Sequence, residues 1–333
     1  MKILVTGCAG FIGYSCSNFF LSKNLRVYGI DNLNNYYDTK IKFDRLKILK
    51  KNQNFTFVKL DLNDSKKLNK FFSKSKFDYV INLAAQAGVR YSIQKPQAYV
   101  ESNLLGFFNI LDACVKYKIK HLLSASTSSV YGTSNKFPLK ENTFTDNPIS
   151  FYAATKKANE VMAHSYSSIH NLQITMLRFF TVYGPWGRPD MAYFKFTKKI
   201  LEGKKIDIYN KGRMYRDYTY VDDIVDGIYK LTNKPPSLLQ KKKFKNDSLS
   251  SVAPFRILNI GNTKKVFLLD FINTLERELK RKVIRNYMPM QKGDVFSTLS
   301  DSTLLKRITG YNPKTNYKTG IKKFINWYID YYN

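Results

Sequence analysis

Residues 2–13 read Lys2-Ile3-Leu4-Val5-Thr6-Gly7-Cys8-Ala9-Gly10-Phe11-Ile12-Gly13, and this stretch decides the fold. The segment Lys2–Val5 has the pattern of a buried strand, and the apolar segment Phe11–Leu21 has that of a helix. The Gly-x-x-Gly-x-x-Gly between them is a variant of the fingerprint by which a strand, a turn and a helix bind a dinucleotide. Glycines allow the tight turn and the close approach of backbone to a pyrophosphate at the helix N-terminus. A second predicted strand, Arg26–Ile30, supplies the context that gives this motif its specificity.

The second strand ends at Asp31, about 20 positions beyond the glycines, where an acidic side chain reads the adenosine ribose hydroxyls. Its charge would repel a 2′-phosphate, and the next residue, Asn32, offers no cation. The sequence therefore favours NAD over NADP as cofactor. The other interpretation of Asp31 is a turn or helix cap.

Strand and helix patterns then alternate. A strand at Phe55–Leu60 ends at Asp61-Leu62, where the carboxylate could reach the adenine amino group, and a strand at Asp78–Leu83 ends at Ala84-Ala85, which are small enough for a cofactor to lie against the backbone. This alternation predicts an α/β fold with a doubly wound parallel sheet and ligands at the strand carboxyl ends. The predicted cofactor-binding residues are Gly7, Gly10, Phe11, Ile12, Gly13, Asp31, Asn32, Asp61, Leu62, Leu83, Ala84, Ala85, Tyr152 and Lys156.

We expect a Rossmann domain over residues 1–180 and a smaller C-terminal substrate-binding lobe over residues 181–333, with a strand and a helix near 221–260 returning to the first domain. The chain shows no internal repeat. The remaining expected strands are His121–Ala125, Gln173–Leu177 and Arg256–Ile260. The remaining expected helices are Pro96–Tyr117, Met191–Leu201, Val221–Leu231, Leu268–Lys280 and Tyr317–Tyr331.

Tyr152 and Lys156 are four residues apart and so share one face of a helix. A free tyrosine has a pKa of about 10 and is a poor base at neutral pH. A lysine cation and a positive nicotinamide ring would favour the phenolate and lower that pKa. The pair therefore predicts a general base for a hydroxyl proton. In a chain with 24 tyrosines the pair could be incidental, but the dinucleotide motif argues against that interpretation.

The composition limits the class of protein. Of the 333 residues, 44% are hydrophobic, and no apolar run is long enough to span a membrane. Cys8, Cys16 and Cys114 show neither metal-ligand nor disulfide spacing, which suits the cytoplasm and predicts no metal site. The net charge of +30 permits nucleic-acid binding, but the basic residues are scattered, and only Lys241-Lys242-Lys243 forms a run. We expect neither a nucleic-acid nor a membrane partner.

The chain resembles the extended short-chain dehydrogenase/reductase family, and within it the nucleotide-sugar 4-epimerases, most closely those that act on UDP-glucuronate. Six blocks carry the resemblance: residues 84–92, 126–132, 152–156, 177–192, 216–220 and 291–295. Asn82 stands where the family usually has histidine, and Tyr218 stands where it usually has phenylalanine.

The resemblance implies the catalytic roles. Thr127 takes the place of the residue that hydrogen-bonds the reacting sugar oxygen, Tyr152 that of the base, and Lys156 that of the residue that binds the nicotinamide ribose. Related dehydratases and decarboxylases carry carboxylates where this chain has Ser128 and Ser129. Serine cannot act as a carboxylate at neutral pH, so elimination and assisted decarboxylation are disfavoured. The expected reaction is NAD-dependent C4 epimerisation of a UDP-sugar, UDP-glucuronate to UDP-galacturonate, through a 4-keto intermediate.

The substrate contacts are less specific. Arg216 is expected at the UDP phosphates or in a surface salt bridge, and Tyr209 on the uracil or in the core. Arg188, aided by Thr181, is the first candidate to pair with a hexuronate carboxylate, and Arg90 is the second. The full set of predicted substrate-binding residues is Gln86, Arg90, Ser128, Thr181, Arg188, Tyr209 and Arg216.

Other functions remain open at this point. Within enzymes they are a UDP-galactose or UDP-N-acetylglucosamine 4-epimerase and a UDP-xylose synthase. Outside enzymes the alternative is a non-catalytic NAD- or RNA-binding protein of the same fold, which would need none of the three catalytic residues. We also expect a homodimer, formed by the helices at Pro96–Tyr117 and Ser150–Ser168 as in related enzymes.

Overall fold

A parallel seven-stranded sheet forms the centre of the computed structural model, which describes residues 1–239 and 247–332. The sheet order is β10-β6-β5-β4-β1-β2-β3, and every neighbouring pair is parallel. Its strands are β1 (Lys2–Thr6), β2 (Arg26–Asp31), β3 (Phe55–Lys59), β4 (Tyr79–Asn82), β5 (His121–Thr127), β6 (Ile174–Phe179) and β10 (Phe255–Ile260). This confirms the predicted doubly wound sheet. The Lys241-Lys242-Lys243 run lies outside the described residues.

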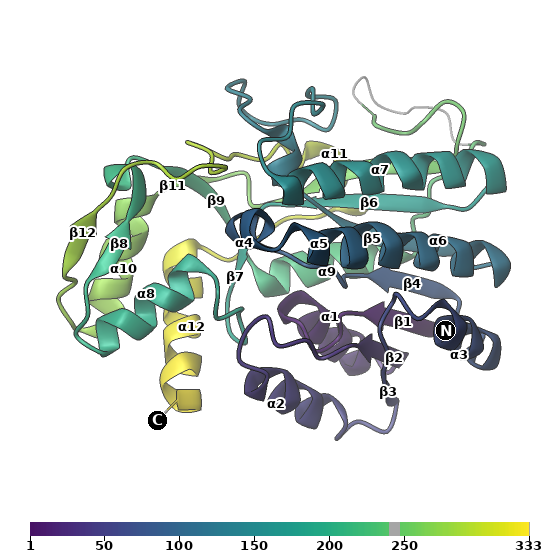
Figure 1. Cartoon of the computed structure of the whole chain (residues 1–333), viewed down its shortest axis with the longest axis horizontal. Helices are drawn as coiled ribbons and strands as arrows, with labels where there is room; N and C mark the ends of the chain where they lie inside the picture. Colours follow the sequence, from purple (N-terminus) through teal and green to yellow (C-terminus); the bar gives the residue numbers. More distant parts are fainter. Residues whose placement is uncertain (240–246, 333) are drawn as a thin grey trace.

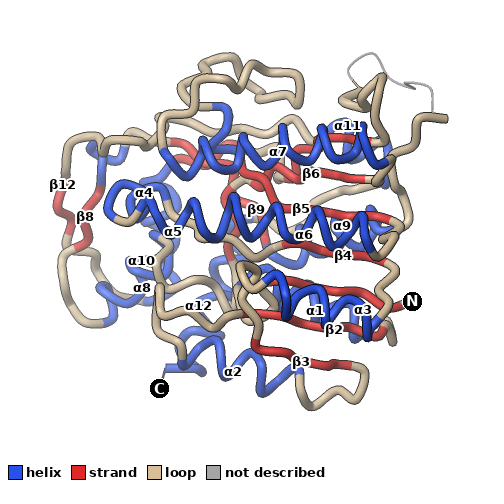
Figure 2. The backbone as a smooth tube through the Cα atoms, turned by 45° about the vertical axis from the view of Figure 1, so that its right-hand side comes forward, coloured by secondary structure: helices blue, strands red, loops and turns tan. Residues whose placement is uncertain are grey.

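Helices cover both faces of this sheet (Figures 1 and 2). One face carries α1 (Phe11–Ser22), α9 (Val221–Thr232) and α11 (Thr303–Thr309), and the other carries α3 (Ser65–Ser75), α6 (Gly106–Lys116) and α7 (Phe151–His170). Side chains alternate along a strand. Ile3 and Val5 of β1 accordingly join the core on the first face, and Leu4 between them joins the core on the second.

The structure corrects several predicted boundaries. The strand β5 continues through Thr127, and β6 continues through Phe179, so Arg178 lies inside the sheet and does not lead out of it. The predicted helix Pro96–Tyr117 is three consecutive elements: α5 (Pro96–Tyr99), a π-helical turn η1 (Val100–Leu105) and α6. The short helix α4 (Val89–Gln94) precedes them.

A smaller lobe stands at one end of the sheet (Figure 1). It contains a mixed sheet of β7 (Thr181–Tyr183), β9 (Tyr215–Tyr220) and β11 (Lys265–Phe267), and a pair of β8 (Ile206–Ile208) and β12 (Arg285–Tyr287). The helices α8 (Ala192–Leu201), α10 (Leu268–Leu279) and α12 (Tyr317–Tyr332) close its core together with a 3-10 turn, η3 (Tyr209–Gly212). The assignment of substrate binding to residues 181–333 stays a prediction.

A helix without a sequence prediction, α2, and the predicted C-terminal helix connect the sheet to the lobe. The helix α2 (Lys40–Leu49) lies between β2 and β3 in the chain, and the C-terminal helix α12 contacts it. The hydroxyl of Tyr331 on α12 donates to Asp44 Oδ2 on α2 at 2.5 Å, and Lys40 Nζ lies 4.9 Å from the Tyr331 ring centroid. The chain therefore joins its first and last parts across the junction of sheet and lobe.

Candidate active site

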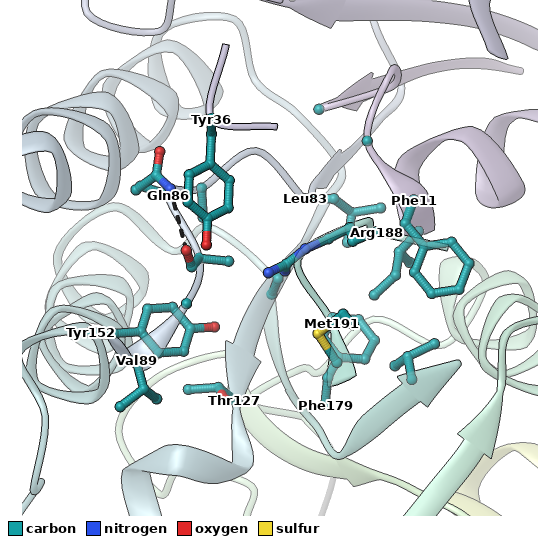
Figure 3. Close-up of a pocket in the computed structure, with 18 of the residues that line it drawn as sticks. Phe11, Tyr36, Leu83, Gln86, Val89, Thr127, Tyr152, Phe179, Arg188 and Met191 are labelled. Carbon is teal, nitrogen blue, oxygen red and sulfur yellow. Dashed lines mark hydrogen bonds between the residues drawn. The ribbon is translucent and has the colours of Figure 1, made fainter. Parts of the chain in front are cut away.

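A cleft of about 550 Å³ lies between the carboxyl ends of the sheet strands and the lobe. This volume is in the range of ligand sites. Every residue predicted for catalysis, cofactor or substrate lines it, although these residues come from segments throughout the chain. Figure 3 shows Phe11, Leu83, Tyr152 and Arg188 around this space. Their contacts with a ligand remain predictions.

The turn after β1 leaves room for a ligand backbone. Gly7 has φ +69°, and a Cβ atom there would lie 2.9 Å from the nitrogen of Ala84. At Gly13 a Cβ would lie 2.0 Å from the Gly7 oxygen, so the helix α1 can begin this close to the turn only without a side chain. These residues fit a dinucleotide, since a pyrophosphate can approach the bare backbone at the N-terminus of α1.

Asp31 holds the same turn in place. Its Oδ2 accepts the backbone N–H of Ala9 at 3.2 Å, and its Oδ1 accepts that of Leu33 at 2.8 Å. Asn32 donates to Asp61 Oδ2 at 2.8 Å, so the ends of β2 and β3 are linked by side chains. Asp31 thus has the capping contacts of its alternative interpretation and also lines the cleft.

Asn32 offers no cation, but a cation from another segment lies near Asp31. Helix α2 places Lys42 Nζ 4.0 Å from Asp31 Oδ1, in the wall of the cleft. This ammonium also donates to the backbone oxygen and Oδ1 of Asn34, at 2.8 and 2.9 Å. Burial lowers the pKa of Lys42, and Asp31 opposes that shift. Because Lys42 is 11 residues beyond Asp31, only the folding of α2 brings the two together.

The Asn82 side chain has a structural role in this chain. It accepts a hydrogen bond from Thr6 at 2.6 Å and donates to Ser124 at 3.0 Å, while the Thr6 hydroxyl accepts the N–H groups of Leu83 and Ala84. These bonds tie the ends of β1, β4 and β5 together and fix the backbone that forms the floor of the cleft.

The three predicted catalytic residues meet at the end of β5 and the first turns of α7. Ser150 caps α7 by accepting the Ala153 N–H at 3.1 Å, which presents Tyr152 to the cleft. In Figure 3 the Tyr152 hydroxyl points into the same space as Thr127. The Thr127 hydroxyl donates to Ser129 Oγ at 3.2 Å.

The electrostatics differ from the expectation for the base. Burial raises the pKa of Tyr152 above its ordinary value, and the Thr127 hydroxyl and the Arg188 guanidinium oppose the increase. Burial also lowers the pKa of Lys156 to about 8, opposed by Glu160. The protein alone therefore favours the neutral phenol, and a positive nicotinamide ring beside it would supply the charge that favours the phenolate.

Asn103, which the sequence analysis missed, organises the surroundings of the base. Its side chain exchanges hydrogen bonds with the backbone of Gln86 at 2.8 and 3.0 Å and donates to Thr155 at 3.0 Å. Its backbone oxygen accepts from Asn159 at 2.6 Å, and Asn159 accepts from Lys156 Nζ at 3.1 Å. Asn103 lies in the π-helical turn η1, and such turns are frequent at functional sites.

A buried ion pair, Arg178 with Glu160, lies one helical turn from Lys156. Arg178 donates twice to Glu160, both at 2.8 Å, and Ser126 donates to the same carboxylate at 2.6 Å. The Arg178 guanidinium also donates to the Glu141 backbone oxygen at 3.0 Å. Because Glu160 follows Lys156 by one helical turn, this pair fixes α7 against the ends of β5 and β6.

Arg188 reaches into the cleft toward Tyr36 and Tyr152 (Figure 3). Its Nε and Nη2 donate to the two oxygens of Asp190 at 2.9 and 2.5 Å, and Tyr36 donates to Asp190 at 3.1 Å. Burial and Asp190 are the main influences on Arg188, and the carboxylate raises the pKa of its guanidinium well above the ordinary value. The arginine predicted to bind a carboxylate therefore contacts one from the chain itself.

The other two predicted arginines also have partners. Arg216 donates to Asp294 Oδ1 at 2.7 Å, and so its partner is not the neighbouring Asp217. The Arg90 guanidinium lies 4.7 Å from the centroid of the Tyr209 ring. Tyr209 thus stands at the surface of the cleft and outside the core, which removes one of its two interpretations.

The parallel sheet, the bare backbone of the glycine turn and the cleft at the strand ends define a dinucleotide-binding protein. Residues 3–245 match the model of the NAD dependent epimerase/dehydratase family, and the chain belongs to that family. The NAD dependence predicted from the glycine turn and Asp31 is thereby confirmed.

Individual relatives narrow the class. The chain is 48% identical to protein CapI of Staphylococcus aureus, over all of this chain and 99% of that protein. It is 43% identical to a probable UDP-glucuronate 4-epimerase of Rhizobium meliloti, over all of this chain and 98% of that one. The crystal structure of UDP-glucuronic acid 4-epimerase from Bacillus cereus, solved with UDP-glucuronic acid and NAD, superposes with a TM-score of 0.89 at 30% identity, and all of both chains is covered.

No helix within the described residues is long and apolar enough to cross a membrane. Within the same residues, no group of three or more histidine, cysteine, aspartate or glutamate side chains could hold a metal ion.

Proposed function

We propose that this protein is an isomerase that converts UDP-glucuronate and UDP-galacturonate into each other by epimerisation at C4. The observation that carries the proposal is the position of Arg188, which reaches into the same space as the Tyr152 hydroxyl and Thr127 (Figure 3). A uronate and the reacting hydroxyl are on adjacent carbons of the sugar, so a carboxylate-binding group must stand near the base.

Tyr152 takes the proton of the C4 hydroxyl as general base, and Thr127 hydrogen-bonds the same oxygen. NAD⁺, which the glycine turn, Asp31 and Lys156 would hold, would supply the acceptor and donor for the C4 hydride. Lys156 holds the nicotinamide ribose, and Asn159 fixes the lysine ammonium at 3.1 Å. Ser128 and Ser129 provide no carboxylate, which leaves rotation of the 4-keto sugar as the available step.

The 4-keto form of UDP-glucuronate is a β-keto acid and tends to lose CO₂. Arg188 and Thr181 restrain the carboxylate so that its bond to the ring stays out of line with the carbonyl π system. The fork of Arg188 already accommodates a carboxylate, that of Asp190, in bidentate geometry. The substrate carboxylate can take over one or both of these donors.

Arg216 and Arg90 bind the UDP part, and Tyr209 packs on the uracil. The supporting geometry is that the Arg90 guanidinium stacks on Tyr209, that Arg216 pairs with Asp294, and that all four residues line the cleft. Gln86 lies beside the sugar, where its backbone is fixed by Asn103.

The test is incubation of the purified chain, loaded with NAD, with UDP-glucuronate, UDP-galactose and UDP-N-acetylglucosamine, followed by product identification. UDP-galacturonate as the dominant product supports the proposal. Turnover of only the neutral sugars would replace it with the galactose-type epimerase, and UDP-xylose as the main product would replace it with the decarboxylating synthase.

We propose a homodimer located in the cytoplasm. Large apolar side chains are exposed along the helices expected at the interface, among them Leu105, Phe108, Val161 and Ile169, and Val161 has 59% of its surface exposed. A second copy of α6 and α7 would cover them, since these helices run side by side on one face (Figure 2). We expect a dimer in light scattering and a monomer for Val161→Glu. A monomeric wild type at micromolar concentration would refute the proposal.

A further inference from the structure

Arg45 on α2 is one of the largest fully buried side chains of the described residues, with 0% of its surface exposed. Its partners are oxygens from two distant parts of the chain. Nη1 donates to the Ala9 backbone oxygen at 2.8 Å and to the Tyr37 hydroxyl at 3.1 Å. Nη2 donates to the backbone oxygens of Trp186 and Gly187 at 2.5 and 3.1 Å.

Burying this charge is expensive, since these four oxygens are neutral and Nε has no partner in the described structure. An apolar side chain of similar size would fill the space at lower cost. The guanidinium, however, supplies what an apolar residue cannot. Nη2 donates to two consecutive carbonyls of one turn, and Nη1 donates to Ala9 and Tyr37 at the same time. The buried guanidinium charge therefore indicates a specific structural role for Arg45 at residues 186–187.

That turn has an unfavourable backbone conformation. Trp186 has φ +59°, in the left-handed region that a bulky side chain rarely adopts. At Gly187 a Cβ would lie 2.1 Å from the Tyr193 hydroxyl, so the chain there packs against α8 without a side chain. A conformation of this kind persists only when its surroundings hold it from several sides.

Both sides of the turn are held. The Trp186 ring packs with centroid distances of 5.5 Å to Tyr14, 5.2 Å to Trp327 and 5.1 Å to Tyr331. On the other side of the turn, the Arg45 guanidinium donates to the carbonyl oxygens of Trp186 and Gly187. The next residue is Arg188, whose side chain leaves this turn into the cleft (Figure 3).

We propose that Arg45 is a positioning residue for the substrate carboxylate: it holds the 186–187 turn so that Arg188 enters the cleft at the level of Tyr152. This inference rests on the proposed function, in which Arg188 binds that carboxylate. Through Ala9, which lies between Gly7 and Gly10, the same guanidinium also fixes the dinucleotide turn. One buried group thus sets the distance between the cofactor turn and the carboxylate clamp.

The alternative is that Arg45 only joins α2 to the lobe. Its loss would then lower stability and weaken every ligand to the same degree. A positioning role predicts a selective loss, because UDP lacks the sugar carboxylate and does not need Arg188.

The experiment compares Arg45→Met with the wild type, both as full-length protein loaded with NAD and normalised to bound NAD. We expect the KM for UDP-glucuronate to rise about tenfold, as for one lost charge-assisted contact, and the inhibition constant of UDP to stay within about twofold. In Arg188→Ala the added Arg45→Met should have little further effect on KM, because the two changes act on one contact.

Arg256→Met is the matched control. Arg256 on β10 is also a buried arginine, but it pairs with the carboxylate of Asp247 at 3.1 Å. Neither residue lines the cleft. This control should lower the unfolding temperature and leave the KM for UDP-glucuronate unchanged. Arg45→Lys is the second variant if Arg45→Met does not fold. An ammonium lacks the planar fork, so the ratio of KM to the UDP inhibition constant should still rise several-fold.

If both Arg45 variants keep the wild-type ratio of the KM for UDP-glucuronate to the UDP inhibition constant, while Arg188→Ala raises that KM, the inference is overturned and the proposed function stays intact. An equal loss for UDP-glucuronate and UDP would also overturn it. An unchanged KM in Arg188→Ala would show that Arg188 is not the clamp, and the inference would fail together with that part of the proposed function.

Discussion

The two sides of the cleft are built differently. On the cofactor side, the residues come from strand ends and turns that hydrogen bonds tie to one another, as when Asp31 accepts the N–H groups of Ala9 and Leu33. On the proposed substrate side, Arg90, Arg188 and Arg216 come from separate segments, and each already contacts another side chain, at Tyr209, Asp190 and Asp294 respectively. The cofactor side is therefore preorganised by hydrogen bonds to the backbone and between strand ends, whereas the substrate side holds its cations in side-chain contacts that a substrate can replace.

The largest expected effect is on the cofactor side, at the base. Tyr152→Phe should lower kcat by about 10²–10⁴-fold, the usual contribution of a general base, while bound NAD stays at the wild-type level. Activity and the NAD content of the purified protein are the two measurements.

Tyr166→Phe is the control for this change, since Tyr166 lies on the same helix but packs on Phe108 and His170. It should retain wild-type kcat. If Tyr152→Phe keeps activity within a few-fold of the wild type, another group is the base and the cofactor side is not the catalytic side.

The next effect is at the carboxylate clamp. Arg188→Ala should weaken UDP-glucuronate turnover about 10–100-fold, because a charged hydrogen bond contributes about 1.5–3 kcal/mol and each 1.4 kcal/mol is tenfold. Turnover of neutral UDP-hexoses should change little, and some decarboxylated UDP-pentose should form. Steady-state kinetics and product chromatography measure both.

Arg277→Ala serves as the matched control, because Arg277 makes an exposed ion pair with Glu278 on α10. If Arg188→Ala has wild-type kinetics and gives no pentose, Arg90 becomes the first candidate for the clamp.

A smaller effect should separate the two ends of the substrate. Arg216→Met removes the proposed phosphate contact, so every UDP-sugar and UDP itself should bind several-fold less tightly, in line with one lost charged contact. Titration with UDP measures this directly. A loss confined to UDP-glucuronate would place Arg216 at the carboxylate and would contradict the division of the lobe into a UDP end and a uronate end.

The smallest effect concerns stability. Burial raises the pKa of Glu141 to about 7 from 4.5, opposed by the Asn259 N–H, which it accepts at 3.0 Å. The folded state then binds more protons than the unfolded state between these pH values, so this group makes the protein less stable as pH rises from 4.5 to 7. Glu141→Gln should remove that dependence, a difference of about 1–2 kcal/mol after screening.

Urea unfolding of both proteins at pH 5 and pH 7.5 is the measurement, and the variant should gain stability relative to the wild type at the higher pH. An equal difference at both pH values would show that Glu141 is already ionised at pH 5. Kinetics on both sides of the cleft should be nearly unchanged.

Much of this protein follows from its sequence. The turn from Gly7 to Gly13, Asp31, and the spacing of Tyr152 and Lys156 are patterns of local structure, because they depend on residues within one strand, turn or helix. They predicted the doubly wound sheet and the NAD-dependent family, and together with the family resemblance they named many of the residues that line the cleft.

Only the tertiary structure decided which groups oppose one another. Lys42 beside Asp31, Asn103 between Gln86 and α7, Asp294 on Arg216, and Arg45 on the 186–187 turn are contacts across segments, for which a single sequence carries no periodic signal. The direction of the Tyr152 pKa shift has the same origin, since burial, which the sequence does not specify, outweighs the charges nearby. Local sequence patterns determine which strand, turn or helix carries each side chain, and the packing of distant segments determines which groups that side chain contacts.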